Sequence, residues 1–88
     1  MPGRWPARSL VDAASEPIVL HSAYRHGVSE DSLRHALRNH VDLFDVGDGM
    51  TMVIGPNRSR GLIEVGVVER HDDLHVAHAM PARPKFLR

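Results

Sequence analysis

The chain contains no cysteine, which excludes disulfides, thiolate zinc sites and a cysteine nucleophile. It also has no apolar run close to the roughly 20 residues that a membrane helix needs. The N-terminus, MPGRWPARSL, is basic but lacks the apolar core of a signal peptide. We therefore expect a cytoplasmic protein that does not enter a membrane, since a small domain without disulfides suits the cytosol.

A surplus of positive charge is missing as well, because 11 basic residues balance 11 acidic ones. Phosphate backbones reward clustered positive charge, so binding to a nucleic acid would require a local surplus. The last six residues provide one, with Arg83, Lys85 and Arg88 and no acid. Two roles remain open for this tail: Phe86 and Leu87 either close the core or stack on a base.

What the chain does contain is an ordinary globular composition, with 88 residues and 42% hydrophobic residues. This length supports one small domain, whose modest stability a partner or a second copy could increase. Pro2, Gly3 and Pro6 oppose regular structure near the start. We therefore expect an N-terminal arm over 1–14 and a single domain over 15–88 that ends in the basic tail.

Helical spacing of apolar residues marks two segments in the first half of the domain. The first is SEPIVLHSAYRHG, with Ser15 as an N-cap and Gly27 as a residue that tolerates positive φ. The second begins at Ser29, has acidic residues in its first turn, and carries the apolar stripe of Leu33, Ala36 and Leu37. The pattern predicts helices over roughly 16–26 and 29–39.

From residue 42 the apolar period changes to two, which predicts short strands. The candidates are DLFDV, MTMVI, GLIEVGVVE and LHVAHAM, separated by turn-forming clusters that contain Gly, Pro, Asn and Asp. Connections this short fit antiparallel hairpins. We therefore predict an α+β fold, with two N-terminal helices packed on one face of a four-stranded antiparallel meander sheet.

Alternation in the third strand separates two faces. The apolar stripe of the second helix and the period of two in this strand predict one buried cluster, which consists of Leu33, Leu37, Ile63, Val65 and Val67. The other face carries Glu64 and Arg70, with Gly66 removing side-chain bulk between them. This face is interpreted either as a solvated surface with an incidental ion pair or as a concave face that accepts a substrate.

The string Arg25-His26-Gly27-Val28, followed by an amphipathic helix, an FDVGDG turn and strands that run into basic residues, resembles the BrnT-type toxins of bacterial toxin–antitoxin modules. That family shows Lys-His-Gly-Val at this point and has a RelE-like fold. The resemblance covers about residues 18–83. It departs at the start of the fold, in the neutral charge, and at the last strand, where Arg83 would do the work of the family's arginine from a shifted position.

The resemblance implies a metal-independent endoribonuclease that inhibits translation by RNA cleavage and is held inactive by a cognate antitoxin protein. Such cleavage needs a base for the ribose 2′-OH, cations for the phosphorane charge and an acid for the leaving 5′-oxygen. His and Arg suit these tasks. The residues expected to take part in catalysis are His26, Glu64 (as a base), Arg70, His78 and Arg83. Those expected to contact RNA are Arg25, Arg58, Arg60, Lys85 and Arg88.

Two alternatives stay open. The same scaffold could be a non-catalytic protein-binding or regulatory module, which the neutral charge favours. The histidines raise the question of a metal, because His71, His75 and His78 lie close together in the sequence beside two aspartates. In a strand, His75 and His78 are expected to point to opposite faces, so we predict no metal site. We also expect no cofactor.

Overall fold

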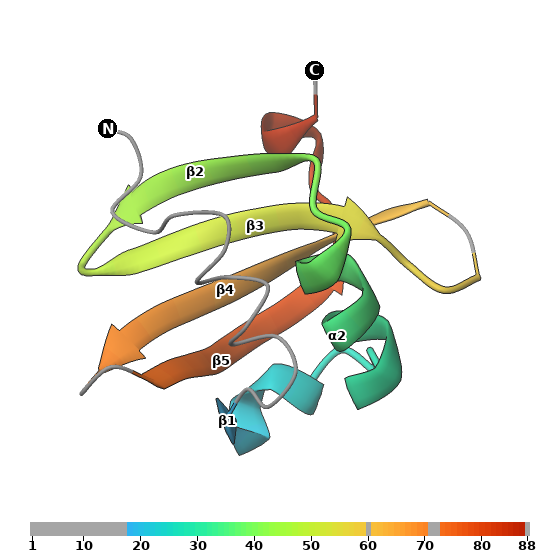
Figure 1. Ribbon diagram of the computed structural model, residues 1–88. Helices are drawn as coiled ribbons and strands as arrows, with labels where there is room; N and C mark the ends of the chain where they lie inside the picture. Colours follow the sequence, from blue (N-terminus) through green and yellow to red (C-terminus); the bar gives the residue numbers. More distant parts are fainter. Residues whose placement is uncertain (1–17, 60, 71–72, 88) are drawn as a thin grey trace.

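The computed structural model describes residues 18–59, 61–70 and 73–87. The elements in these ranges are β1 (Ile18–Val19), the 3₁₀ turn η1 (His21–Tyr24), α2 (Glu30–Arg38), β2 (Asp42–Gly47), β3 (Met50–Pro56), β4 (Leu62–Arg70), β5 (Asp73–Pro81) and the 3₁₀ turn η2 (Pro84–Phe86) (Figure 1). None of the helices in these ranges is long and apolar enough to cross a membrane. The predicted N-terminal arm, residues 1–14, lies outside the described residues.

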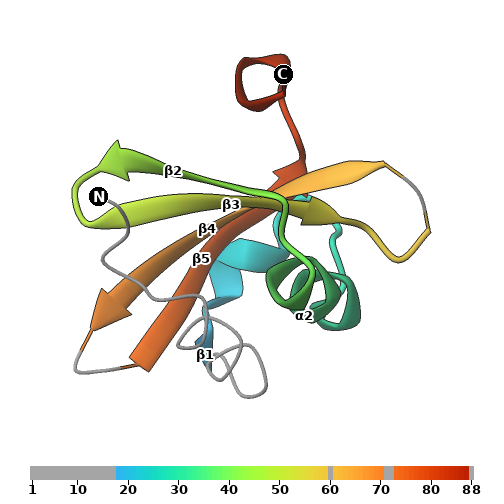
Figure 2. The same cartoon turned by 45° about the horizontal axis from the view of Figure 1, so that its top comes forward.

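The strands form one mixed sheet in the order β1-β5-β4-β3-β2. The β2–β3, β3–β4 and β4–β5 pairs are antiparallel, whereas β1 pairs in parallel with β5. Helix α2 covers one face of the sheet, and the tail with η2 lies on the other side (Figure 2). The sheet therefore has a helix face and a tail face, and the names are used in that sense below.

Helix α2 confirms the prediction for 29–39. Ser29 is the N-cap, and its hydroxyl accepts a hydrogen bond from the Ser32 N–H at 3.1 Å. Leu33, Ala36 and Leu37 are buried against the helix face. Gly55 on β3 permits this close packing, because a Cβ there would collide with the backbone carbonyl of Ala36.

The prediction of two helices on a four-stranded antiparallel sheet is wrong. The described part of the chain contains one α-helix and a five-stranded mixed sheet. Ile18 and Val19 pair with His75 and Val76 of β5, and the chain then makes only the short turn η1. The β-branched pair fits a strand better than a helix, and the open edge of β5 gave it a partner. Of the predicted helix, residues 16–17 lie outside the described ranges.

Strand β5 contains one extra residue. Gly66 pairs with His78 and the next residue of β4 pairs with Val76, which leaves Ala77 as a bulge. The bulge shifts the alternation along β5 by one residue. It places His75 on the same face as His78, so the expectation that these two side chains point to opposite faces is wrong.

The predicted core is confirmed. Its members are at most 1% exposed and belong to one cluster on the helix face: Leu33, Leu37, Ile63, Val65 and Val67. A second, smaller cluster lies on the tail face, where Phe86 packs with Met52 and Ile54. The Phe86 ring also lies 5.5 Å from the Phe44 ring, measured between centroids. Phe86 therefore closes the core, which is one of the two roles that the sequence left open for it.

Candidate functional site

A carboxylate is buried on the tail face of the sheet. Ile63 and Val65 point to the helix face, and the alternation of β4 turns Glu64 between them to the other side. The Glu64 side chain is 0% exposed. A buried charge is costly unless it is paired and hydrogen-bonded, so the partners of Glu64 define the site.

Arg83 is the first partner. Its Nε donates to Glu64 Oε1 at 3.0 Å, its Nη2 donates to Oε2 at 2.6 Å, and its main-chain N–H donates to Oε1 at 2.9 Å. The hydrogen bond from the Ala82 N–H to the Leu62 carbonyl, at 3.0 Å, brings the tail back beside β4. The planar guanidinium thus binds the carboxylate in the two-point manner that is characteristic of Arg.

His78 is the second partner. It lies opposite Gly66 on the neighbouring strand, and its Nε2 is 2.9 Å from Glu64 Oε2. Because an ionised carboxylate only accepts hydrogen bonds, this contact places a proton on Nε2. The other ring nitrogen, Nδ1, has no hydrogen bond to any residue in the described ranges, and the His78 side chain is 27% exposed. The imidazole is therefore oriented by a carboxylate and has one nitrogen left for other chemistry.

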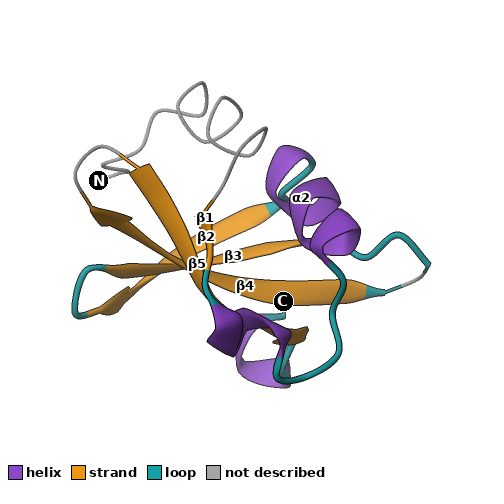
Figure 3. Ribbon diagram, turned by 90° about the horizontal axis from the view of Figure 1, so that it is seen from below, coloured by secondary structure: helices purple, strands orange, loops and turns teal. Residues whose placement is uncertain are grey.

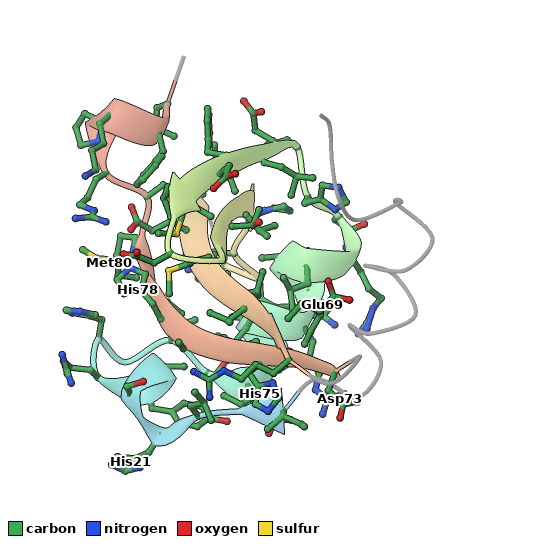
Figure 4. The ribbon with its side chains drawn as sticks, turned by 90° about the vertical axis from the view of Figure 1, so that its left-hand side faces the viewer. His21, Glu69, Asp73, His75, His78 and Met80 are labelled. Carbon is green, nitrogen blue, oxygen red and sulfur yellow. The ribbon has the colours of Figure 1, made fainter. Side chains whose placement is uncertain are left out.

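His26 lies against His78. The two ring centroids are 5.9 Å apart, and the ring planes meet at 74°, in an edge-to-face arrangement. His26 belongs to the loop between η1 and α2, which are among the purple elements in Figure 3. Figure 4 shows His78 and Met80 side by side on β5, with His75 further along the strand. All but one of the predicted catalytic residues thus meet in one cluster, made of His26, Glu64, His78 and Arg83.

The contacts between Glu64 and Arg83 favour the charged forms of these two residues. Burial raises the pKa of Glu64, but the hydrogen bonds from Arg83 and then His78 outweigh this effect and hold the pKa of the carboxyl below its usual value. The hydrogen bond to Glu64 in turn raises the pKa of Arg83. Glu64 is buried, ionised and fully engaged, so its placement suits a residue that positions His78 better than it suits the base predicted from the sequence.

Arg70, the remaining predicted catalytic residue, is not in the cluster. It lies at the far end of β4, opposite Asp73. Six residues of extended strand separate it from Glu64, which corresponds to roughly 20 Å. The structure therefore separates the two charged residues that the sequence placed together on one face.

The predicted RNA-contacting residues fall in different places. Arg25 is exposed beside His26. Lys85 lies on η2, with its Nζ 5.3 Å from the centroid of the Phe86 ring. Arg58 forms an ion pair with Asp31 at 2.9 Å, between the β3–β4 loop and the start of α2. Arg60 and Arg88 lie outside the described residues.

The concave face, one of the two interpretations left open for this side of β4, is filled at Gly66. A Cβ at this position would lie 3.0 Å from Met50 Sδ and 3.1 Å from His78 Cβ. Gly66 therefore lets a methionine and the site histidine approach the sheet. Met50 was not predicted at this position, because its place opposite β4 depends on how β3 and β4 pair, and the sequence does not reveal that register.

Within the described ranges, no group of three or more histidine, aspartate or glutamate side chains is arranged to hold a metal ion. The fold and the cluster define a small α+β protein in which a buried carboxylate orients a histidine and an arginine. Comparisons with protein-family models, with curated proteins and with solved structures find no match for this chain.

Proposed function

We propose that the protein is a metal-independent endoribonuclease of the toxin–antitoxin kind, which inhibits translation by cleaving RNA. The observation that supports this function best is the arrangement of His78, which Glu64 holds at one nitrogen and which His26 contacts edge-to-face. Two adjacent imidazoles beside a guanidinium supply the proton transfers and the positive charge that phosphodiester cleavage without a metal requires.

In the proposed reaction, Nδ1 of His78 removes the proton from a ribose 2′-OH. The 2′-oxygen attacks the adjacent phosphorus, and the bond between phosphorus and the 5′-oxygen breaks. His26, in its protonated form, gives a proton to the leaving 5′-oxygen. The products are one strand that ends in a 2′,3′-cyclic phosphate and one that begins with a 5′-OH. Glu64 keeps the proton of His78 on Nε2 and thereby leaves Nδ1 free to act.

Arg83 has donors left for the substrate. Its hydrogen bonds to Glu64 use Nε, Nη2 and the main-chain N–H. Nη1 makes no hydrogen bond to any residue that the structure describes, and the side chain is 42% exposed. The N–H groups of Nη1 can therefore bind a phosphoryl oxygen while Glu64 fixes the guanidinium plane. Arg25 and Lys85 add positive charge for the flanking phosphates.

A cytoplasmic location and a cognate antitoxin protein belong to the same proposal. The antitoxin would restrain the enzyme by covering the exposed edges of His26, His78 and Arg83. A homo-oligomer is compatible with this arrangement.

Purified protein and a single-stranded RNA test the reaction. We expect cleavage in the presence of EDTA, with a 2′,3′-cyclic phosphate on the upstream product. The same oligonucleotide with 2′-deoxyribose at the cleaved position should stay intact, because it lacks the attacking hydroxyl. Cleavage of the deoxy substrate, or cleavage that depends on added metal, would contradict the proposed chemistry.

One observation favours a second function, that of a non-catalytic binding or regulatory module. Glu64 finds all of its partners within the chain, and these contacts also fasten the tail. If these contacts served only to hold the tail in place, the structure would show the same arrangement. In that case RNA would stay uncut by a well-folded protein.

A further inference from the structure

Beside the proposed catalytic cluster, the short turn that carries His26 also carries an exposed tyrosine. The N–H of Gly27 donates to the Tyr24 carbonyl at 3.1 Å, which closes a four-residue turn with Arg25 and His26 at its centre. Gly27 has a φ of +79°, a value that L side chains rarely adopt. The turn therefore carries a tyrosine, an arginine and a histidine in three consecutive residues.

The turn is anchored to β5 next to His78. The N–H of Leu20 donates to the Val76 carbonyl at 2.8 Å, and the Ser22 hydroxyl donates to the Ala77 carbonyl at 2.7 Å. Ala23, between these contacts and the turn, is fully buried. The segment that ends in Tyr24 is thus held against the strand that carries His78, and Tyr24 itself stays 39% exposed.

We propose that Tyr24 forms a subsite for an unpaired nucleobase next to the phosphate that is cleaved. This inference rests on the proposed function. Aromatic faces bind the bases of single strands by stacking, and neighbouring cations bind the phosphates. Phe86, the other aromatic residue near the site, is buried in the tail-face cluster and does not offer a free ring face there. The subsite makes the preferred substrate an RNA whose nucleotides flank the cleaved bond without base pairing.

The KM and kcat for steady-state cleavage of a single-stranded RNA test for the subsite. Tyr24→Leu should raise KM by about 5- to 100-fold, the range typical of one lost stacking contact, and should leave kcat nearly unchanged. Tyr24→Phe keeps the ring and should behave like the wild type. Val46→Ala is the matched control, because Val46 is similarly exposed but lies on β2 at the opposite edge of the sheet.

Abasic substrates identify the partner of the ring. Two oligonucleotides, each lacking the base on one side of the cleaved bond, are compared with the intact RNA. For one of them, the wild type should show the same loss as Tyr24→Leu, and combining the two changes should add little more. If the loss caused by Tyr24→Leu added in full to the loss caused by the missing base for both oligonucleotides, the subsite would be overturned.

The outcomes separate this inference from the proposed function. If the wild type cleaves no RNA, the proposed function fails and the subsite with it. If the wild type cleaves RNA and Tyr24→Leu cleaves it with an unchanged KM, only the subsite is overturned. A change of mass in sedimentation with an unchanged KM would assign Tyr24 to a contact between protein chains, which also overturns the subsite.

Discussion

Arg83 and Glu64 are 19 residues apart in the sequence, yet the Glu64 carboxylate accepts hydrogen bonds from both the guanidinium and the main-chain N–H of Arg83. These bonds hold the start of the tail above β4, so that Phe86 can pack on the tail face three residues later. The same contacts position Arg83 beside His78. Closure of the small second core and assembly of the candidate site therefore depend on one buried carboxylate.

The ionisation of Glu64 makes stability depend on pH. Its pKa in the folded protein lies below the ordinary value of 4.5, so the stabilisation is present above about pH 4.5 and is lost as the pH falls through the lower, folded value. Glu64→Gln should lower the free energy of unfolding by about 1.5–3 kcal/mol at pH 7. Urea melts should show this difference unchanged down to about pH 5 and shrinking at lower pH. A difference that grows towards acid pH would contradict this assignment.

Truncating a side chain in the helix-face core should lower the free energy of unfolding by a large amount. Leu37 is fully buried between α2 and the sheet, so Leu37→Ala should cost about 2–5 kcal/mol of unfolding free energy in denaturant melts. Val46→Ala, at an exposed position of β2, should change it by less than about 0.5 kcal/mol. A loss below about 0.5 kcal/mol for Leu37→Ala would mean that α2 packs through another face.

Much of this core was predictable from the sequence, because the cap at Ser29 and the helical stripe act locally and the period of β4 is regular. The segment around Ile18 was not, because its apolar spacing fits a helix while its actual partner, β5, lies more than fifty residues away. The bulge at Ala77 has no signal in the sequence. It nevertheless decides which face His75 takes. The residue types of the site were predictable from their chemistry, whereas the burial of Glu64 and the distance of Arg70 depend on register and strand length.

Arg83→Ala should reduce the cleavage rate by roughly 10²–10³-fold, because it removes a preorganised donor for the phosphorane charge. It should also lower the melting temperature, since the buried Glu64 would lose the guanidinium and keep only His78 and the main-chain N–H of residue 83 as partners. Arg83→Lys retains the charge but not the two-point geometry, so we expect it to recover stability better than rate. Equal recovery of both would indicate that Arg83 supplies only charge.

Chelation should change neither folding nor cleavage. The chain has no thiolate, and the proposed proton transfers use His26 and His78. We expect equal melting temperatures and equal cleavage rates with and without EDTA. A stoichiometric metal that survives dialysis would contradict this expectation, and His75 and His78 would be the first ligands to test, because the bulge at Ala77 places them on one face.

Expression of the protein in a bacterium without an antitoxin, followed by measurements of growth and RNA integrity, shows whether the protein is an RNA-cleaving toxin. His26 is the most suitable position to change, because it is exposed and its ring contacts the ring of His78. We expect arrested growth and cleaved RNA with the wild type, and relief with His26→Ala through a rate loss of roughly 10²–10⁴-fold. Arrest should continue with Arg34→Ala, which changes an exposed ion pair on α2. Normal growth and intact RNA with well-folded wild-type protein, or equal toxicity of His26→Ala, would contradict these expectations.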